Sequence, residues 1–134
     1  MSVALTKDSI DLGIIVKDAD ASLKFYRDTL GLEEQGTMPM PGGGTMYRLL
    51  CGTSLIKLVD PGQSPPAEAA PGGIAGATGY RYWTISVSNL DDVAKACEEA
   101  GYKVAVSPRE IRAGIKITMI EDPDGNWVEL LEIS

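Results

Sequence analysis

The sequence of 134 residues contains no histidine, only two cysteines and a single phenylalanine. No imidazole is therefore available as a general base or as a metal ligand. The two cysteines, Cys51 and Cys97, lie far apart and outside any Cys-x-x-Cys spacing. We expect two buried free thiols, because an unpaired cysteine usually behaves as a small hydrophobic side chain. A reactive Cys51 would need a neighbouring base or cation.

Positive charge and long apolar segments are also scarce. The chain has 12 lysines and arginines against 19 aspartates and glutamates, a formal net charge of −7, and its basic residues are scattered. This composition argues against binding of nucleic acid or anionic membranes, which needs clustered cations. No apolar run approaches the roughly 20 residues that span a bilayer, and residues 1–9 lack the apolar core of a signal peptide. We expect a cytoplasmic protein with a single domain, residues 1–134.

The chain contains one pattern twice, at residues 11–31 and again at residues 82–101. In each copy an apolar strand is followed by an Asx residue at a helix N-cap position, and a glycine later stops the helix. The cap residues are Asp18 and Asn89. An internal repeat of this kind predicts two similar halves with a cavity between them.

The first half, at about residues 8–60, is predicted to form one βαβββ module. The apolar run over 10–16 predicts a strand buried on both faces. Asp18 is expected to cap a helix over 19–30, which Gly31 ends. Three further strands are expected at 32–37, 45–51 and 54–59.

A segment rich in proline, glycine and alanine, residues 61–79, links this module to a second one at about 80–134. Its length leaves two interpretations open: a passive tether, or a segment that folds over the mouth of the cavity. The second module has the same element order. We expect its strand at 80–88, its helix at 90–100 behind the Asn89 cap, and strands at 102–106, 115–120 and 127–133, with Ser107-Pro108 ending the first of these three.

Three segments carry a family resemblance: Leu12-Gly-Ile-Ile-Val-Lys-Asp18, Ser22-Leu-Lys-Phe-Tyr26 with Leu30-Gly-Leu32, and Glu121-Asp-Pro-Asp-Gly-Asn-Trp-Val-Glu129. They resemble the vicinal oxygen chelate (VOC) superfamily, which includes glyoxalase I, extradiol dioxygenases and bleomycin-resistance proteins. The resemblance covers nearly the whole chain and implies an α+β fold, with two tandem βαβββ modules forming a curled mixed sheet around a cavity. It also implies a homodimer. Because the superfamily hosts unrelated functions, it implies no single activity.

In the metal-dependent members of the VOC superfamily, the first and last strands of each module supply the metal ligands, commonly His, Glu, His and Glu. The resemblance places these positions at Asp11 and Lys57 in the first module and at Tyr82 and Glu129 in the second. Corresponding positions are 71 and 72 residues apart, as an internal repeat requires. Only Glu129 matches the usual ligand.

Lys57 is unsuited to a divalent-metal site. Its ammonium has no lone pair to donate, and a dication about 4 Å away would cost roughly 8 kcal/mol at an effective dielectric near 20. We expect no cofactor, with Lys57 standing where the metal would and the carboxylates of Asp11 and Glu129 beside it. The alternative is a hard ion held by Asp11 and Glu129, if Lys57 swings aside or loses its proton.

Strand alternation indicates which other side chains line the predicted cavity. With Tyr82 facing inward, Tyr80 and Thr84 face inward too, and Trp127 accompanies Glu129 on the last strand. A lining of aromatic, aliphatic and hydroxyl groups suits a small organic molecule with a few polar groups.

Tyr47 and Arg48 are adjacent on one strand, so only one of them faces inward. An inward Arg48 would favour a carboxylate or phosphate on the ligand, and a surface position for Arg48 is the other possibility.

Three functions remain open. The favoured one is a glyoxalase/bleomycin-resistance-like protein that binds a small organic molecule in the inter-module cavity. The second is a metal-independent lyase or isomerase, in which Glu129 takes a proton next to a carbonyl and Lys57 or Tyr82 stabilises the enolate oxygen. The third is a metal-dependent lyase, isomerase or dioxygenase, similar to lactoylglutathione lyase, that uses Asp11, Glu129 and water.

Overall fold

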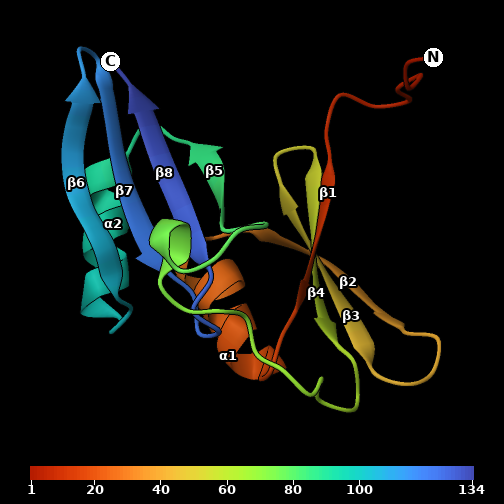
Figure 1. Ribbon diagram of the computed structural model, residues 1–134. Coiled ribbons are helices and arrows are strands. Elements are labelled where there is room, and N and C mark those ends of the chain that lie inside the picture. The colour runs from red at the N-terminus through yellow and green to blue at the C-terminus, as the bar shows by residue number, and fades with distance from the viewer. The chain divides into compact units, whose positions relative to one another are not determined.

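The computed structural model describes all residues, Met1–Ser134, and divides them into two compact units, Met1–Pro65 and Pro66–Ser134. Each unit contains one βαβββ module with its own four-stranded mixed sheet (Figure 1). The predicted α+β class and the repeated element order are confirmed. None of the helices has the length and apolar character needed to cross a membrane.

Module one is a sheet in the order β1-β4-β3-β2. Strand β1 runs parallel to β4, and the other two pairings are antiparallel. Its elements are β1 (Asp11–Ile15), α1 (Ala19–Leu23), η1 (Lys24–Thr29), β2 (Glu33–Pro39), β3 (Thr45–Cys51) and β4 (Ser54–Asp60).

The helical segment of module one begins where the sequence predicts. The backbone N–H of Ala21 donates to Asp18 Oδ1 at 3.2 Å, which is the expected N-cap bond. After Leu23 the helix widens into a π-helical turn, in which the N–H of Leu30 donates to the carbonyl of Phe25, five residues earlier. Gly31 then takes a φ of 79°, a left-handed conformation that ends the helix.

The prediction that the first strand is buried on both faces is wrong. Along β1, exposed and half-buried residues alternate, and Ile15 is 53% exposed. Strand β1 lies at one edge of its sheet, and only the side chains of Leu12 and Ile14, on the face opposite Asp11, are partly covered. The apolar residues on both faces of β1 therefore did not indicate that both faces are buried.

Module two has the sheet order β5-β8-β7-β6, again with its first strand parallel to its last. The helix α2 covers one face of β6, β7 and β8 (Figure 1). The elements are β5 (Tyr82–Ser86), α2 (Leu90–Glu99), β6 (Val104–Arg112), β7 (Ile115–Glu121) and β8 (Trp127–Ile133), preceded by a short 3-10 turn, η2 (Gly73–Ala75).

Two details of module two differ from the prediction. Asn89 stands at the N-cap of α2 but makes no side-chain capping bond; instead the carboxylate of Glu132 accepts from the N–H of Leu90 at 2.9 Å. Strand β6 also continues through Pro108. A proline is tolerated there because β6 is an edge strand and its register shifts between Val106 and Arg109.

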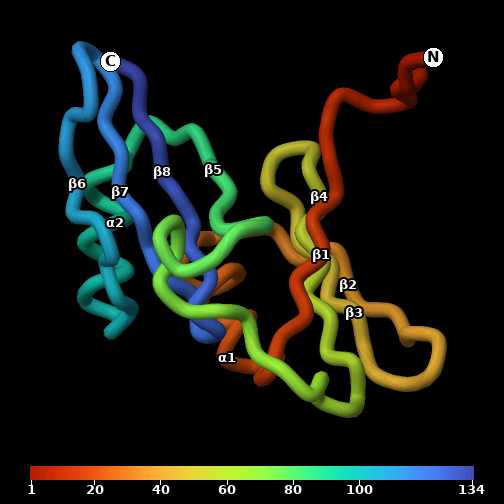
Figure 2. The backbone as a smooth tube through the Cα atoms, in the orientation of Figure 1, coloured from red at the N-terminus to blue at the C-terminus, as the bar shows by residue number.

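The segment before β5 is held to module two by one arginine. Arg81 donates from Nε to the carbonyl of Gly73 at 2.7 Å and from Nη2 to the carbonyls of Ala70 and Pro71 at 2.7 and 3.2 Å. Figure 2 shows this stretch of chain passing beside β8. Residues 70–76 are therefore folded against module two, which does not fit a purely passive tether.

Both cysteines are free thiols, as expected, but only Cys97 is buried as the sequence predicts. Cys97 is fully buried on α2, and burial raises the pKa of its thiol to about 11. Cys51 is half-buried, and burial raises the pKa of its thiol as well. Neither thiol has the low pKa of a reactive nucleophile.

Candidate ligand-binding site

The strand registers support the placement of the four predicted positions. Asp11 pairs with Leu55 in module one, and Tyr82 pairs with Trp127 in module two. Leu55 and Trp127 are 72 residues apart, and Asp11 and Tyr82 are 71 residues apart. The same pairing therefore occurs at equivalent positions of the two modules. Lys57 on β4 therefore corresponds to Glu129 on β8.

Lys57 forms an ion pair with Asp11, as expected for the first module. Its Nζ lies 3.5 Å from Asp11 Oδ2, and each side chain is about one-third exposed. Asp11 also accepts a hydrogen bond from Lys7 Nζ at 2.5 Å. The bond from Lys7, with a smaller contribution from the charge of Lys57, holds the pKa of the Asp11 carboxyl below its usual range.

Arg48, and not Tyr47, shares the sheet face of Lys57. Arg48 is directly opposite Lys57 in the β3–β4 pairing, and residues that are opposite each other project from the same face. Glycines flank this pair: Gly13 is opposite Lys57 on β1, and Gly36 is opposite Arg48 on β2. We call the line Gly13–Lys57–Arg48–Gly36 the cation row.

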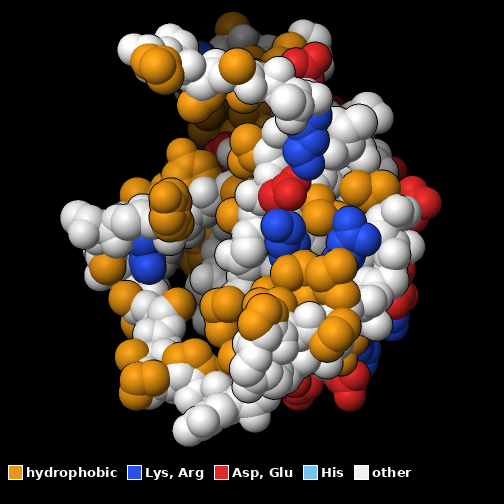
Figure 3. Space-filling view, turned by 90° about the vertical axis from the view of Figure 1, so that its right-hand side faces the viewer, with side chains coloured by type: hydrophobic (Ala, Val, Ile, Leu, Met, Phe, Trp, Pro, Cys, Tyr) orange, Lys and Arg blue, Asp and Glu red, His pale blue; other side chains and the backbone are white.

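Apolar residues lie on both sides of the cation row. One neighbouring row includes Leu55 and Leu50, and the other consists of Ile15, Val59, Met46 and Met38. In the space-filling view, blue basic side chains adjoin a red acidic one, and patches of orange hydrophobic side chains lie beside them (Figure 3). This face of module one thus combines a few charges with apolar surroundings.

In module two, Glu129 is held by Thr84. The Thr84 hydroxyl donates to Glu129 Oε1 at 2.7 Å, and the two residues are paired in the β5–β8 register. Along β5 the residues Tyr82, Thr84 and Ser86 are exposed, whereas Trp83 and Ile85 are partly buried. The predicted alternation along β5 is therefore confirmed.

Trp127 and Tyr80 have different surroundings from those of Thr84. Gly73 approaches the Trp127 indole ring so closely that a Cβ there would collide with it. The Trp127 Nε1 is buried and has no hydrogen-bond partner. Tyr80 precedes β5 and is fully exposed. A ligand contact by Tyr80 stays a prediction.

The structure thus joins the predicted site residues in two pairs, Asp11 with Lys57 and Thr84 with Glu129. The two pairs belong to different units. A contact of Lys57 with Glu129 therefore stays a prediction.

A family model described as the Glyoxalase/Bleomycin resistance protein/Dioxygenase superfamily matches residues 9–130. The chain belongs to this superfamily. No curated protein matches the sequence at a significant level.

Solved structures show the same superfamily fold. A glyoxalase family protein from Bacillus cereus has 18% identity and a TM-score of 0.81, covering 98% of this chain and 96% of that one. The antibiotic binding protein TnmS3 from Streptomyces sp. CB03234 has 20% identity and a TM-score of 0.72, covering 99% and 100%. The trypanothione-dependent glyoxalase I of Leishmania major has 22% identity and a TM-score of 0.67, covering 91% and 84%. At these identities the likeness shows the fold alone.

The metal ion that many superfamily members use does not fit module one of this chain. The ligand position on β4 holds the Lys57 ammonium, which has no lone pair and already pairs with Asp11. No group of three or more Cys, Asp or Glu side chains within either unit is arranged to hold a metal ion.

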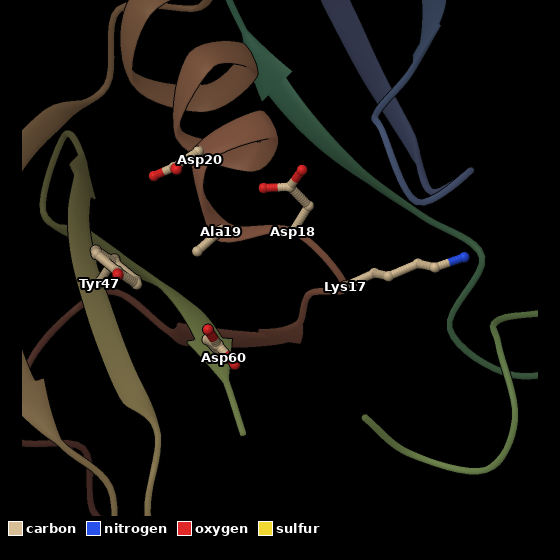
Figure 4. Close-up of a pocket in the computed structure, with 6 residues that line it drawn as sticks. All are labelled: Lys17, Asp18, Ala19, Asp20, Tyr47 and Asp60. Carbon is tan, nitrogen blue, oxygen red and sulfur yellow. The ribbon is translucent and has the colours of Figure 1, made fainter. Parts of the chain in front are cut away.

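A separate hollow of about 610 Å³ lies within module one, near the start of α1. It is lined by Lys17, Asp18, Ala19, Asp20, Tyr47 and Asp60. In Figure 4, Tyr47 and Asp60 come from neighbouring strands, and the Lys17 side chain extends away from them. Asp18 caps α1 and Asp60 accepts from the N–H of Gly62 at 2.9 Å, so two of the carboxylates have structural roles. Tyr47 lies in this hollow, on the sheet face opposite Lys57.

Three features of the site were missed in the sequence. Lys7 binds Asp11, although it precedes the first strand by several residues. Gly13 interrupts an apolar strand, which is a signal of close approach or open space beside the backbone. The carbonyl contacts of Arg81 had no sequence signal, because they depend on the path of residues 70–76.

Proposed function

We propose that this protein binds a small organic ligand on the sheet face that carries Lys57, without a catalytic metal ion. The observation that carries the proposal is the Lys57–Asp11 ion pair at the position where superfamily metalloenzymes hold a ligand. Apolar side chains around the pair offer the mixed surface typical of small-molecule sites. The shared fold with an antibiotic binding protein adds support.

A thermal-shift screen with aromatic and glycopeptide compounds tests this proposal. A ligand that raises the Tm of the wild-type protein should lose most of its effect on Lys57→Met, because the ammonium on the binding face is gone while the aliphatic stem is largely kept. The control is Lys95→Met, which changes an exposed lysine on α2 of module two. If no compound shifts the Tm, or if both variants respond like the wild type, binding on this face is refuted.

A second function, metal-independent proton transfer, is favoured by the Thr84–Glu129 hydrogen bond at 2.7 Å. The Thr84 hydroxyl orients one carboxylate oxygen and leaves the other free to act as a base. Glu129 would take a proton from carbon next to a carbonyl, and the electron pair of the broken C–H bond would form an enolate. Tyr82, on the same face of β5 as Thr84, would donate a hydrogen bond to the enolate oxygen. Return of the proton to another carbon completes an isomerisation.

Glu129→Gln tests this second function, since an amide does not accept the proton. For a substrate found in the screen, turnover should fall by about a hundredfold or more while binding changes little. Thr84→Val should reduce turnover less, because it removes only the orientation. Unchanged turnover in Glu129→Gln would rule out Glu129 as the base.

We further propose a cytoplasmic homodimer, as many superfamily members form paired modules. Light scattering coupled to gel filtration would give the mass of two chains. A monomer at micromolar concentration would contradict this.

A further inference from the structure

We propose that the cation row is a carboxylate subsite, which selects ligands that carry one carboxylate on an apolar body. The inference rests on the proposed binding function and deepens it by naming the chemical class of the ligand. It starts from the pairing of Arg48 with Lys57 across β3 and β4.

Two cations directly opposite each other on one sheet face repel, which disfavours the folded protein. Lys57 is compensated in part by Asp11, but Arg48 forms no ion pair or hydrogen bond. The other carboxylate on this face, Glu33 opposite Leu50, accepts a hydrogen bond from Gln35 and does not pair with Arg48. The half-buried Arg48 guanidinium is therefore available to an external anion.

The glycines of the row leave room for that anion. Apart from the glycine and its two chain neighbours, no atom lies within 4 Å of the point where a Cβ would stand on Gly13 or on Gly36. Larger side chains at these positions would cover the flanks of Lys57 and Arg48. The two cations are thus accessible from both sides along the row, and a planar carboxylate matches the paired donors of a guanidinium.

The apolar row beside the cations indicates what else the ligand carries. Ile15 is 53% exposed and Met38 is 44% exposed, and between them lie Val59, which is buried, and Met46, which is half-buried. A ligand whose apolar part covers this row would bury surface that now faces solvent. A small inorganic anion would gain nothing from it, so the arrangement favours an organic acid over free phosphate.

Calorimetric titration with matched probes tests the inference on the full-length protein. The probes are octanoate and naphthoate, each compared with its uncharged primary amide, and inorganic phosphate. We expect each acid to bind about tenfold or more tightly than its amide, and phosphate to bind more weakly than either acid. Arg48→Gln should reduce the preference for acid over amide to less than about threefold.

Arg109→Gln is the matched control, because Arg109 is an exposed arginine on β6 in module two. Its acid-over-amide ratio should equal that of the wild type. Equal binding of acid and amide would overturn the carboxylate subsite and leave the proposed binding function standing. If phosphate bound as tightly as the acids, the inference that the ligand carries an apolar body would be overturned. Absence of binding by both probe pairs would overturn the inference itself, while the thermal-shift screen decides the proposed function separately.

Arg48→Gln is expected to fold, since Arg48 makes no contact that stabilises the sheet by charge. Its Tm should equal or exceed that of the wild type. A lowered Tm together with lost binding would assign Arg48 a structural role and overturn the subsite.

Discussion

The Lys57 Nζ lies 3.5 Å from Asp11 Oδ2, across the parallel pair formed by the first and last strands of module one. In superfamily members that use a metal, these strands carry ligands with lone pairs. Here one position holds an ammonium that cannot coordinate and that already neutralises the carboxylate beside it. Module one of this chain therefore carries a positively charged side chain at the position where the metal-dependent members carry a metal ligand.

Replacing that ammonium by a carboxylate should restore affinity for a hard divalent ion. Lys57→Glu places two carboxylates side by side, and we expect Mn²⁺ to raise its Tm, whereas the wild type should show no shift. Lys116→Glu is the control: Lys116 pairs with Asp91 at 2.9 Å, so this variant also creates two adjacent carboxylates, away from the site. An equal Mn²⁺ response in both variants would mean that the superfamily position has no special geometry.

The ion pairs of Asp11 should make stability depend on pH. Because the pKa of Asp11 is lowered in the folded protein, its stabilising contribution is present above the unfolded pKa and is lost as the pH falls through the folded one. Urea unfolding should therefore show Asp11→Asn to be less stable than the wild type near neutral pH, with a difference that shrinks in acid. Asp8→Asn, which removes an exposed carboxylate outside the ion pairs of Asp11, is the control. A difference that grows in acid would contradict the account.

Removal of the Arg48 charge should stabilise the protein slightly. Without a ligand, the repulsion between Arg48 and Lys57 opposes folding, so Arg48→Gln should raise the free energy of unfolding by about 0.2–1 kcal/mol. The gain should shrink at high salt, which screens charges that are partly exposed. Denaturant titration at low and high ionic strength measures both effects. A loss of stability that is independent of salt would mean that packing of the aliphatic stem of Arg48 stabilises the protein by more than its charge repulsion destabilises it.

Arg81→Ala should release residues 70–76 from module two. The substitution removes three hydrogen bonds to backbone carbonyls, at 2.7, 2.7 and 3.2 Å. A hydrogen bond to a charged group contributes about 1.5–3 kcal/mol to stability. We expect less from each of these bonds, because the contacts are largely exposed. Hydrogen exchange and limited proteolysis should show faster exchange and cleavage within residues 70–76, with α2 unchanged. Arg112→Ala, an exposed arginine at the end of β6, is the control. Equal protection in both variants would show that the packing of Gly73 on Trp127 holds the segment without Arg81.

Much of the fold could be predicted from the sequence because its local signals agree with its tertiary structure. Asp18 caps a helix and Gly31 ends it, and the Gly52-Thr53 turn joins two strands at the predicted place. Predictions failed where the outcome depended on distant partners. Asn89 loses its capping role to Glu132, which is 43 residues later in the chain, and β6 passes through Pro108 because it has a neighbour on one side only.

The candidate site was predictable in its positions but less so in its surroundings. The family resemblance, supported by the spacing of the internal repeat, located Asp11, Lys57 and Glu129, and strand alternation placed Thr84 on the same face of β5 as Tyr82. The hydrogen bond between Thr84 and Glu129 depends on the register of β5 against β8, which the sequence did not predict. The choice between Tyr47 and Arg48 needed the register of β3 against β4, which no local pattern in the sequence determines.

The most direct test of the central claim is the metal content of the wild-type protein, purified without chelators and analysed for all first-row transition metals, magnesium and calcium. With the Lys57 ammonium at the ligand position, less than about 0.1 equivalent of any metal per chain is expected. A content near one equivalent, lost in Glu129→Gln or Asp11→Asn, would contradict the account.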